Sequence, residues 1–198
     1  MDVVIVKYNA GNIRSVANAL RRLGVSALLT DDTEAISRAD KVLLPGQGEA
    51  GNAMAYLRAR GLDRVIRSLT QPTLGICIGQ QLLCRHSDEG DTDCIGVMDT
   101  GVRRFVPTRH EDKVPQMGWN SLLVTAPDNP LFKGVPQGSF VYFVHSYYVP
   151  VCEYTTATAD YIHPFSAATR KGNFYATQFH PEKSGAVGER ILKNFLDL

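Results

Sequence analysis

The sequence predicts an α/β fold with a mostly parallel central sheet, helices on both faces and antiparallel additions in the second half. Three observations support this prediction. In the first half, short apolar runs alternate with segments of helical periodicity, which is typical of a parallel sheet covered on both faces. From about Ile95 to Phe179 the helical periodicity disappears, and β-type runs alternate with turn residues. A last amphipathic segment, residues 185–196, predicts a closing helix.

The first predicted strand, residues 3–7, is a continuous apolar run that leads into the first helix. Asn12 is expected to cap this helix, apolar residues recur at helical spacing from Ile13 to Leu23, and Gly24 is expected to end it. The other elements of the first half follow in alternation. Strands are expected at residues 27–30, 42–44 and 73–76, and helices at 33–39, 50–60, 62–69 and directly after Cys77.

The second half supplies β-type runs that we expect to extend the sheet in antiparallel fashion. These runs are residues 101–105, 121–124, 140–144, 155–159, 167–169 and 174–179. The closing helix is expected to turn Val187, Ile191, Leu192 and Phe195 inward. Because the sequence has no internal repeat, low-complexity tract or long linker, it predicts a single domain over residues 1–198.

Length and composition narrow the function classes. A chain of 198 residues that is 44% hydrophobic can bury a continuous core, but it has no room for a second catalytic domain. The 21 basic and 20 acidic residues give a net charge of +1 without a basic run, which argues against nucleic-acid binding. We expect no signal peptide and no membrane span, because no apolar run approaches bilayer length. Four cysteines without a CxxC pair predict reduced thiols and a cytoplasmic location.

Cys77 lies at a turn between an apolar strand and a helix, flanked by Gly75 and Gly79. Glycines at these positions allow a tight backbone turn that exposes the sulfur, and the following helix directs its N-terminus at the thiol, which favours thiolate. A buried structural thiol is the usual role of a free cysteine, and we assign that role to Cys84, Cys94 and Cys152. Cys84 is expected to lie on the helix that follows Cys77.

His180 and Glu182 supply the partners that a cysteine nucleophile needs. The imidazole would take the thiol proton and later deliver it to a leaving group, and the carboxylate two residues on would orient the ring. Pro181 stops the preceding strand, so the chain can fold back at this point. Two alternatives remain open: His180 as a hydrogen-bonded core residue, and Glu182 as a carboxylate that only stabilises a helix start.

An attacked amide develops an oxyanion, which requires preorganised donors. The N–H of Ile78, directly after Cys77, is one candidate. The segment from Pro45 to Gly48 is expected to supply the second from Gln47, because its two glycines permit a backbone flip. The alternative is an ordinary glycine turn between a strand and a helix.

The glycine-flanked cysteine, the His180-Pro181-Glu182 segment and their order resemble the class I glutamine amidotransferases. Within that family the chain most resembles the glutaminase subunits of imidazole glycerol phosphate synthases, and the resemblance runs the length of the chain. The segments on which this closer resemblance rests are residues 8–16, 115–120, 142–148 and 180–185.

The resemblance implies a set of glutamine contacts. They are Gly46, Gly48, Gln81, Glu89, Ser146 and Tyr147. Glu89 would meet the α-ammonium group and the backbone at Ser146 and Tyr147 the α-carboxylate, although residues 87–91 also look like a solvated acidic loop. The family often has valine where this chain has Gln47, so the effect of Gln47 on the backbone flip is open.

The resemblance also implies a face towards a synthase partner. Its residues are Asn12, Trp119, Tyr142 and Lys183. Trp119 could instead be a core aromatic residue, although Trp and Tyr are favoured as interface anchors. A nearby basic cluster, which includes Arg103, Arg104, Arg109 and His110, is expected to be a solvated face.

The implied activity is hydrolysis of L-glutamine through a cysteine thioester, without metal or cofactor. The ammonia would pass to a cyclase subunit, a (β/α)₈ barrel, in a heterodimer that makes imidazole glycerol phosphate for histidine biosynthesis. Alternatives are a stand-alone thiol hydrolase such as a γ-glutamyl hydrolase, a glutaminase subunit for another synthase, and a catalytically silent binding subunit.

Overall fold

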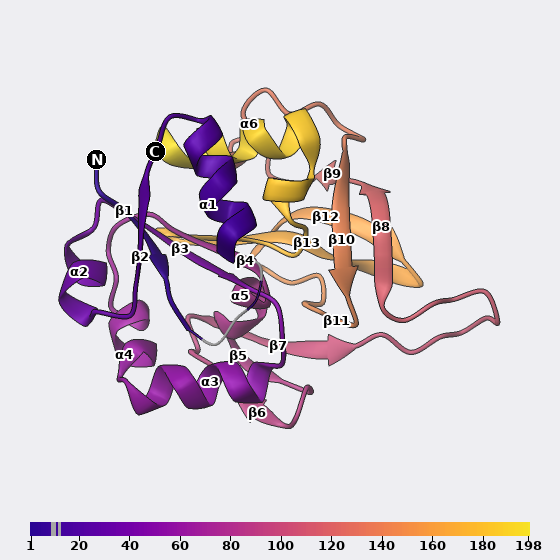
Figure 1. Cartoon of the computed structure of the whole chain (residues 1–198). Coiled ribbons are helices and arrows are strands. Elements are labelled where there is room, and N and C mark those ends of the chain that lie inside the picture. Colours follow the sequence, from indigo (N-terminus) through magenta and orange to yellow (C-terminus); the bar gives the residue numbers. More distant parts are fainter. Residues whose placement is uncertain (9–10, 12) are drawn as a thin grey trace.

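An eight-stranded sheet with helices on both sides dominates the computed structural model, which describes residues 1–8, 11 and 13–198 (Figure 1). The strand order of this sheet is β2-β1-β3-β4-β14-β13-β12-β9. Its strands are β1 (Val3–Val6), β2 (Ala27–Thr30), β3 (Lys41–Gly46), β4 (Thr73–Cys77), β9 (Leu123–Val124), β12 (Thr155–Tyr161), β13 (His163–Lys171) and β14 (Phe174–Thr177). The helices are α1 (Ile13–Arg22), α2 (Thr33–Arg38), α3 (Ala50–Ala59), α4 (Leu62–Arg67), α5 (Ile78–Leu82) and α6 (Gly185–Leu196), with two 3₁₀ turns, η1 (Pro130–Phe132) and η2 (Pro181–Lys183).

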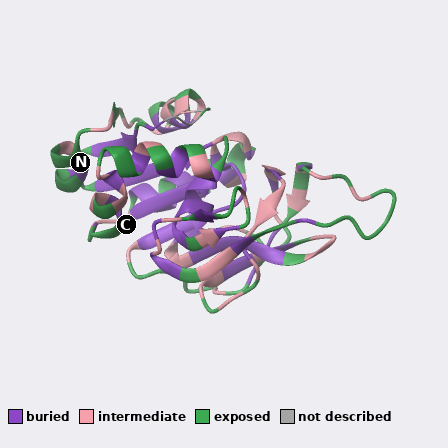
Figure 2. Cartoon of the chain, turned by 90° about the horizontal axis from the view of Figure 1, so that it is seen from below, coloured by how far each residue is buried: buried purple, intermediate pink, exposed green. Residues whose placement is uncertain are grey.

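The two faces of the sheet bury different side chains, as the two-residue period of a strand requires. Val3 and Ile5 of β1 pack into the cluster that contains α1 and α6, whereas Val4 and Val6 pack into the cluster that contains α2, α3 and α4. The central strands β1, β3, β4 and β14 are therefore buried (Figure 2), whereas the edge strand β2 is partly exposed. This is the predicted α/β class with helices on both faces, and the prediction is confirmed.

The first half of the chain follows the sequence prediction closely. The predicted strand at residues 27–30 has the observed bounds, and the other elements of this half differ by one or two residues. The closing helix at the other end of the chain, residues 185–196, also has the predicted bounds. Gly24 ends the first helix with a positive φ of 81°, the left-handed conformation that glycine adopts readily. The predicted cap Asn12 lies outside the described residues.

The second half departs from the prediction that all its strands add to the sheet in antiparallel fashion. β14 pairs in parallel with β4, because the tight β13–β14 turn sends it back along the sheet with its free edge against β4. Two groups of strands lie outside the main sheet. One is a two-stranded ribbon of β8 (Gln116–Ser121) and β10 (Phe140–His145); the other is a four-stranded sheet of β5 (Cys84–Ser87), β6 (Thr92–Asp93), β7 (Met98–Arg104) and β11 (Tyr147–Tyr148).

One further prediction is wrong, and one strand was missed. Cys84 begins strand β5 instead of continuing the helix after Cys77, because that helix ends at Leu82 and the chain turns to pair with β7. Strand β8 was not predicted as a strand, since residues 116–120 alternate Met and Trp with Gly and Asn and form no apolar run.

The connection between β7 and β8, residues 106–115, extends away from the body of the molecule (Figure 1) and is largely exposed. Its charges are balanced locally: Arg109 pairs with Asp112 at 3.1 Å and with Glu111 at 3.7 Å. The basic residues named from the sequence are exposed, as expected of a solvated face. Across the described part of the chain, no helix is long and apolar enough to span a bilayer.

Candidate active site

Cys77 occupies the turn between β4 and α5 with φ 55° and ψ −109°, a conformation that non-glycine residues rarely adopt. The flanking glycines are required by close packing. A Cβ atom on Gly75 would lie 2.8 Å from the backbone of Gly79, and one on Gly79 would collide with the carbonyl oxygen of Leu44. The backbone therefore forms the predicted nucleophile turn, and the Cys77 side chain is 6% exposed.

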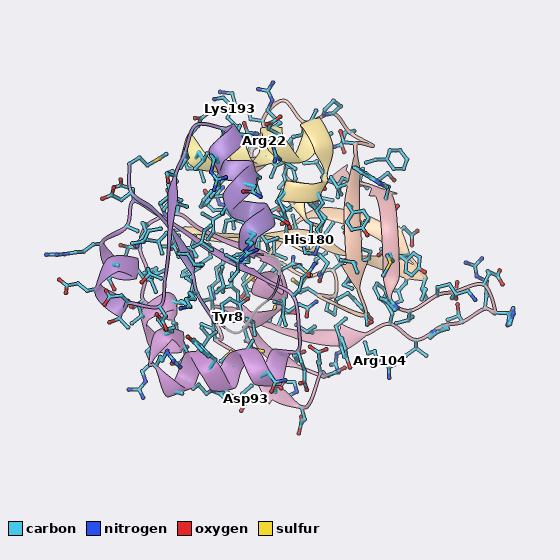
Figure 3. The ribbon with its side chains drawn as sticks, viewed as in Figure 1. Tyr8, Arg22, Asp93, Arg104, His180 and Lys193 are labelled. Atoms are coloured by element: carbon cyan, nitrogen blue, oxygen red, sulfur yellow. The ribbon has the colours of Figure 1, made fainter. Side chains whose placement is uncertain are left out.

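His180 reaches Cys77 because β14 and β4 are parallel neighbours. Thr177 pairs with Ile76, so both strands end at the same edge of the sheet and the residues that follow them meet there. Figure 3 shows His180 in the interior of the fold, whereas the labelled Arg22, Lys193 and Arg104 lie at its periphery. The predicted pairing of residues distant in sequence is thus a direct result of the topology.

The imidazole of His180 is held by Glu182. Nδ1 of His180 lies 2.8 Å from Oε1 of Glu182, and the two side chains are 1% and 0% exposed. Because a carboxylate only accepts hydrogen bonds, Nδ1 carries a proton and Nε2 is left to exchange a proton with the thiol. Neither residue is a plain core or helix-capping group, so the arrangement favours the catalytic interpretation over both alternatives.

The electrostatics favour a charged imidazole. Burial alone would lower the pKa of His180, but the neighbouring Cys77 sulfur and the hydrogen bond to Glu182, with the negative charge of both groups, raise it to about 9. A protonated His180 beside Cys77 is the arrangement that stabilises a thiolate. We refer to Cys77, His180 and Glu182 together as the catalytic trio.

A cavity of about 340 Å³ opens in front of Cys77. Its walls bring together residues from five separate segments of the chain. They are Gln47, Gly48, Cys77, Ile78, Gln81, Glu89, Pro115, Val144, His145, Ser146 and Tyr147. Apart from Gly46, every glutamine contact implied by the resemblance lies in this wall, together with both predicted oxyanion donors.

Gly46 lies behind the wall instead, at the end of β3. A Cβ atom there would collide with the Tyr8 hydroxyl and with Ile78, so the position requires glycine. Tyr8 is 3% exposed, and burial followed by the charge of Cys77 raises the pKa of its phenol. The adjacent carbonyl of Gln47 accepts a hydrogen bond of 3.1 Å from the N–H of Gly11.

Glu89 is half-buried rather than solvated. Its Oε2 accepts a hydrogen bond of 2.8 Å from the N–H of Ala50 at the start of α3. Burial raises the pKa of this carboxyl, and the Ala50 bond opposes the increase. The acidic-loop interpretation therefore does not describe Glu89, because a hydrogen bond fixes this carboxylate in the cavity wall.

Gln81 is fixed by two hydrogen bonds from its amide nitrogen. Nε2 donates to the carbonyl of Tyr147 and to Oε1 of Gln178, each over 3.0 Å. Both N–H bonds are thereby used, so Gln81 offers the cavity only the acceptor oxygen of its amide.

The predicted partner residues gather on the outer side of the β8–β10 ribbon. Trp119 is 56% exposed, which excludes the core alternative, and its ring meets that of Tyr142 edge-on at 6.0 Å. Nζ of Lys183 lies 5.8 Å from the centre of the Tyr142 ring. Asn12, the fourth predicted partner residue, lies outside the described residues.

The outer side of the ribbon is more extensive than these three residues. Side chains alternate along both strands, so that Val141, Phe143 and His145 point inward to the core. The opposite side presents Met117, Trp119, Phe140, Tyr142 and Val144, which we call the ribbon face. Met117 and Phe140 are 67% and 60% exposed.

The remaining cysteines differ from Cys77. Burial raises the pKa of the Cys84 thiol and raises that of Cys94 to about 12, so both are poor nucleophiles. All four cysteines, each within the described part of the chain, are unpaired. The same described residues contain no cluster of His, Cys, Asp and Glu arranged to hold a metal ion.

Comparison with known proteins decides the family. The family model for glutamine amidotransferase class I matches residues 4–198. The chain belongs to the class I glutamine amidotransferases. Among curated relatives, the imidazole glycerol phosphate synthase subunit HisH of Bacteroides thetaiotaomicron is 62% identical to this amidotransferase, and that of Bacteroides fragilis is 61% identical. Both comparisons extend over 198 residues and cover all of both chains. The HisH subunit of Yersinia pestis is 45% identical over 199 residues, again covering both chains fully.

Solved structures agree on the fold. A glutamine amidotransferase superposes with a TM-score of 0.74 at 21% identity, covering 98% of this chain and 97% of that one. The glutaminase domain of Trypanosoma brucei CTPS with bound acivicin gives a TM-score of 0.68 at 16% identity, covering 100% and 94%. At these identities the likeness establishes the architecture of this amidotransferase.

One residue beside the catalytic trio of this amidotransferase was not predicted from the sequence. Gln178 is fully buried, and its Nε2 donates a hydrogen bond of 3.6 Å to the sulfur of Cys77. The signal in the sequence is its place two residues before His180, in the bend that follows β14.

Proposed function

We propose that this amidotransferase hydrolyses L-glutamine at Cys77 and supplies the ammonia to a separate cyclase subunit, as the glutaminase of an imidazole glycerol phosphate synthase in histidine biosynthesis. One observation is central to the proposal. The catalytic trio meets at the ends of two adjacent parallel strands, with Cys77 facing a cavity of about 340 Å³. The full-length identity to HisH subunits supports the same function.

The reaction begins from the ion pair in which the thiol proton of Cys77 already lies on Nε2 of His180. The sulfur then attacks the carboxamide carbon of glutamine, a C–S bond forms, and the carbonyl electrons move onto oxygen. Collapse of this tetrahedral species breaks the C–N bond, and His180 gives its proton to the departing ammonia. Water, deprotonated by His180, attacks the γ-glutamyl thioester, and the C–S bond breaks to release glutamate and regenerate the thiol.

Glu182 acts throughout by holding the imidazole. Its bond to Nδ1 keeps the ring oriented with Nε2 towards the sulfur and stabilises the imidazolium that forms. Because both side chains are almost fully buried, this pairing is only weakly screened by solvent.

We assign the oxyanion to two backbone donors. The N–H of Ile78 lies at the start of α5, where the first-turn N–H groups have no partner within the helix. The second donor is the N–H of Gln47, and we expect Gly46 and Gly48 to allow the peptide between them to turn towards the cavity.

The remaining wall of the cavity is suited to an amino acid. Glu89 provides a carboxylate for the α-ammonium group, the backbone at Ser146 and Tyr147 provides donors for the α-carboxylate, and Gln81 provides an acceptor. Gly48 keeps a side chain away from the bound substrate, whereas Gly46 makes room for Tyr8 and Ile78 behind the wall.

For the partner we propose the (β/α)₈ cyclase subunit, bound in a cytoplasmic heterodimer at the ribbon face. A contiguous exposed apolar surface with aromatic residues marks an interaction site. Val144 belongs both to the ribbon face and to the cavity wall, so a partner on this face would lie next to the site where ammonia is released. A stand-alone hydrolase would have no use for this surface. Asn12 is assigned to the same interface by resemblance alone.

The test is the rate of glutamine hydrolysis by the free chain, by its complex with the cyclase, and by the complex with a cyclase ligand. If the Gly46–Gly48 backbone rests with its donor turned away, the free chain lacks one oxyanion donor, which costs on the order of 10²–10³ in rate. We expect stimulation of that size in the liganded complex. Equal rates in all three states would contradict the partner-dependent function and favour the stand-alone hydrolase.

A further inference from the structure

The sulfur of Cys77 receives a hydrogen bond from a residue outside the catalytic trio. Nε2 of Gln178 lies 3.6 Å from Sγ, within the range of hydrogen bonds to sulfur, and the Gln178 side chain is fully buried. Gln178 directly follows β14 and contacts the sulfur two residues before His180, in the bend that leads from the strand. What this contact does depends on which end of the amide faces the sulfur.

The orientation of the amide follows from a chain of hydrogen bonds that starts at a backbone carbonyl. The carbonyl of Tyr147 can only accept, so the group of Gln81 that lies 3.0 Å from it is the donor Nε2. The same nitrogen lies 3.0 Å from Gln178, and therefore faces the acceptor Oε1 of that residue. The other end of the Gln178 amide, its N–H donor, must then face the sulfur.

The origin of this chain is itself fixed. Nδ1 of His145 lies 2.7 Å from the same carbonyl of Tyr147 and donates to it. His145 is neutral, because burial and the nearby His180 lower its pKa to about 4 against the raising effect of the Tyr147 bond. Its other nitrogen, Nε2, lies 3.0 Å from the side-chain amide of Gln116 in β8; because Nδ1 carries the one proton of the neutral ring, Nε2 accepts, and the NH₂ end of that amide must face it.

We infer that Gln178 is a positioning residue for the nucleophile: its N–H, oriented by Gln81, holds the Cys77 sulfur and stabilises the thiolate. The inference rests on the proposed function of Cys77 and adds a residue to it. Hydrogen bonds to a charged acceptor are stronger than those to a neutral one, so the contact favours the ionised thiol over the protonated one.

Several titratable groups act on the same sulfur. His180 at the start of η2 and Tyr8 after β1 interact with it directly, Glu182 acts through His180, and Glu89 faces the same cavity from the opposite wall. His145 acts through His180. The pH midpoint of an alkylation curve therefore belongs to Cys77 and its neighbour His180 together. Variants that keep Cys77, His180 and Glu182 unchanged therefore show how much of this midpoint depends on Gln178.

The experiment measures the rate of Cys77 alkylation by iodoacetamide against pH in the full chain, with the modified cysteine identified by mass spectrometry. Gln178→Met keeps the size of the side chain and removes the donor. In this variant we expect the pH at which the alkylation rate is half-maximal, the midpoint, to rise by about one unit. This is the usual size of the effect when one hydrogen bond to a charged group is lost. Glutamine turnover should fall mainly in kcat, because Gln178 contacts the sulfur.

A second variant tests the orientation step. Gln81→Met leaves Gln178 in place but removes the bond that orients its amide, so the midpoint should rise in the same direction by a smaller amount. Gln80→Met is the matched control: Gln80 is an equally buried glutamine in the same helix, but its Nε2 donates to the Ser166 carbonyl and to Oγ1 of Thr169. Its midpoint should equal that of the wild type.

Circular dichroism establishes that each variant is folded before it is compared. If Gln178→Met does not fold, the midpoint of Gln81→Met decides the question. An unchanged midpoint in a folded Gln178→Met, or in Gln81→Met if that variant alone folds, overturns the inference. Such a result would leave glutamine hydrolysis at Cys77 standing, because that function is tested separately by removing Cys77.

Discussion

The catalytic trio and the ribbon face are neighbours in the fold but differ in almost every physical respect. The trio is nearly inaccessible to solvent and hydrogen-bonded, and one hydrogen bond fixes its imidazole. The ribbon face is apolar, and three of its five side chains are more than half exposed. The difference teaches that the groups proposed to break bonds are already positioned within this chain, whereas the apolar surface beside them is the surface that we propose a partner covers. Mutations on either side should therefore separate catalysis from association.

The largest expected effect comes from removing the nucleophile. Cys77→Ala should reduce glutamine hydrolysis by a factor on the order of 10⁴ or more, as is typical when a nucleophile is lost. Association with the cyclase should persist, because Cys77 is 6% exposed and lies away from the outer surface of the ribbon. The measurement is glutamate release together with a binding titration.

Ammonium salts provide the control for this variant. A complex that contains Cys77→Ala should still form product from ammonium ions, since the cyclase reaction does not need the thiol. If the assembled complex fails to use ammonium, the chain contributes more than ammonia and the separation of the two regions breaks down.

The next effect concerns the ribbon face. Trp119→Ala should weaken binding to the cyclase by about 2 kcal/mol, or about 30-fold in Kd, as expected for an exposed aromatic anchor that becomes buried on association. The stability of the free chain should hardly change. Leu28→Ala is a suitable control, because Leu28 is also 56% exposed but lies on β2 at the opposite edge of the sheet. Equal losses of affinity in both variants would show that the ribbon face is not the interface.

The smallest expected effect is on stability. The pKa of His180 is raised to about 9 from an ordinary value near 6.5, so its protonation stabilises the fold fully below pH 6.5, and this stabilisation is lost as the pH rises through 9. Glu182→Gln removes the negative charge of Glu182, which is one of the causes of the raised pKa of His180. Urea unfolding should show it about 1.5 kcal/mol less stable than the wild type near pH 6, with the difference shrinking above pH 9. A difference that grows with pH would contradict a charged His180.

The sequence allowed the layered half of the fold to be predicted because its signals are local. Alternating apolar runs and helical spacing determine β1 to β4, and Gly24 marks a helix end by its own conformation. The small sheets could not be predicted in the same way. β8 is half exposed, so it lacks an apolar run, and the parallel pairing of β14 with β4 depends on a contact between residues about 100 positions apart.

The residues of the candidate site also differ in whether short motifs in the sequence could predict them. Cys77, His180 and the glycines were predictable because their chemistry and backbone geometry leave marks in short motifs. Glu89 and Gln81 needed the resemblance, since an acidic loop or a helical glutamine has many ordinary uses. Gln178 and His145 needed the structure, because the role of each depends on partners brought together from β8, β11, α5 and β14.

The alternation along β10 also limits how this segment can change in length during evolution. Inserting or deleting one residue between Tyr142 and Ser146 would reverse every following side chain, so that His145 would face solvent and Val144 would enter the core. The cavity wall and the ribbon face would be lost in the same event, and no single later substitution could restore both. Among natural variants we therefore expect length changes here to be absent or to occur in pairs, whereas the exposed segment 106–115 should accept single insertions.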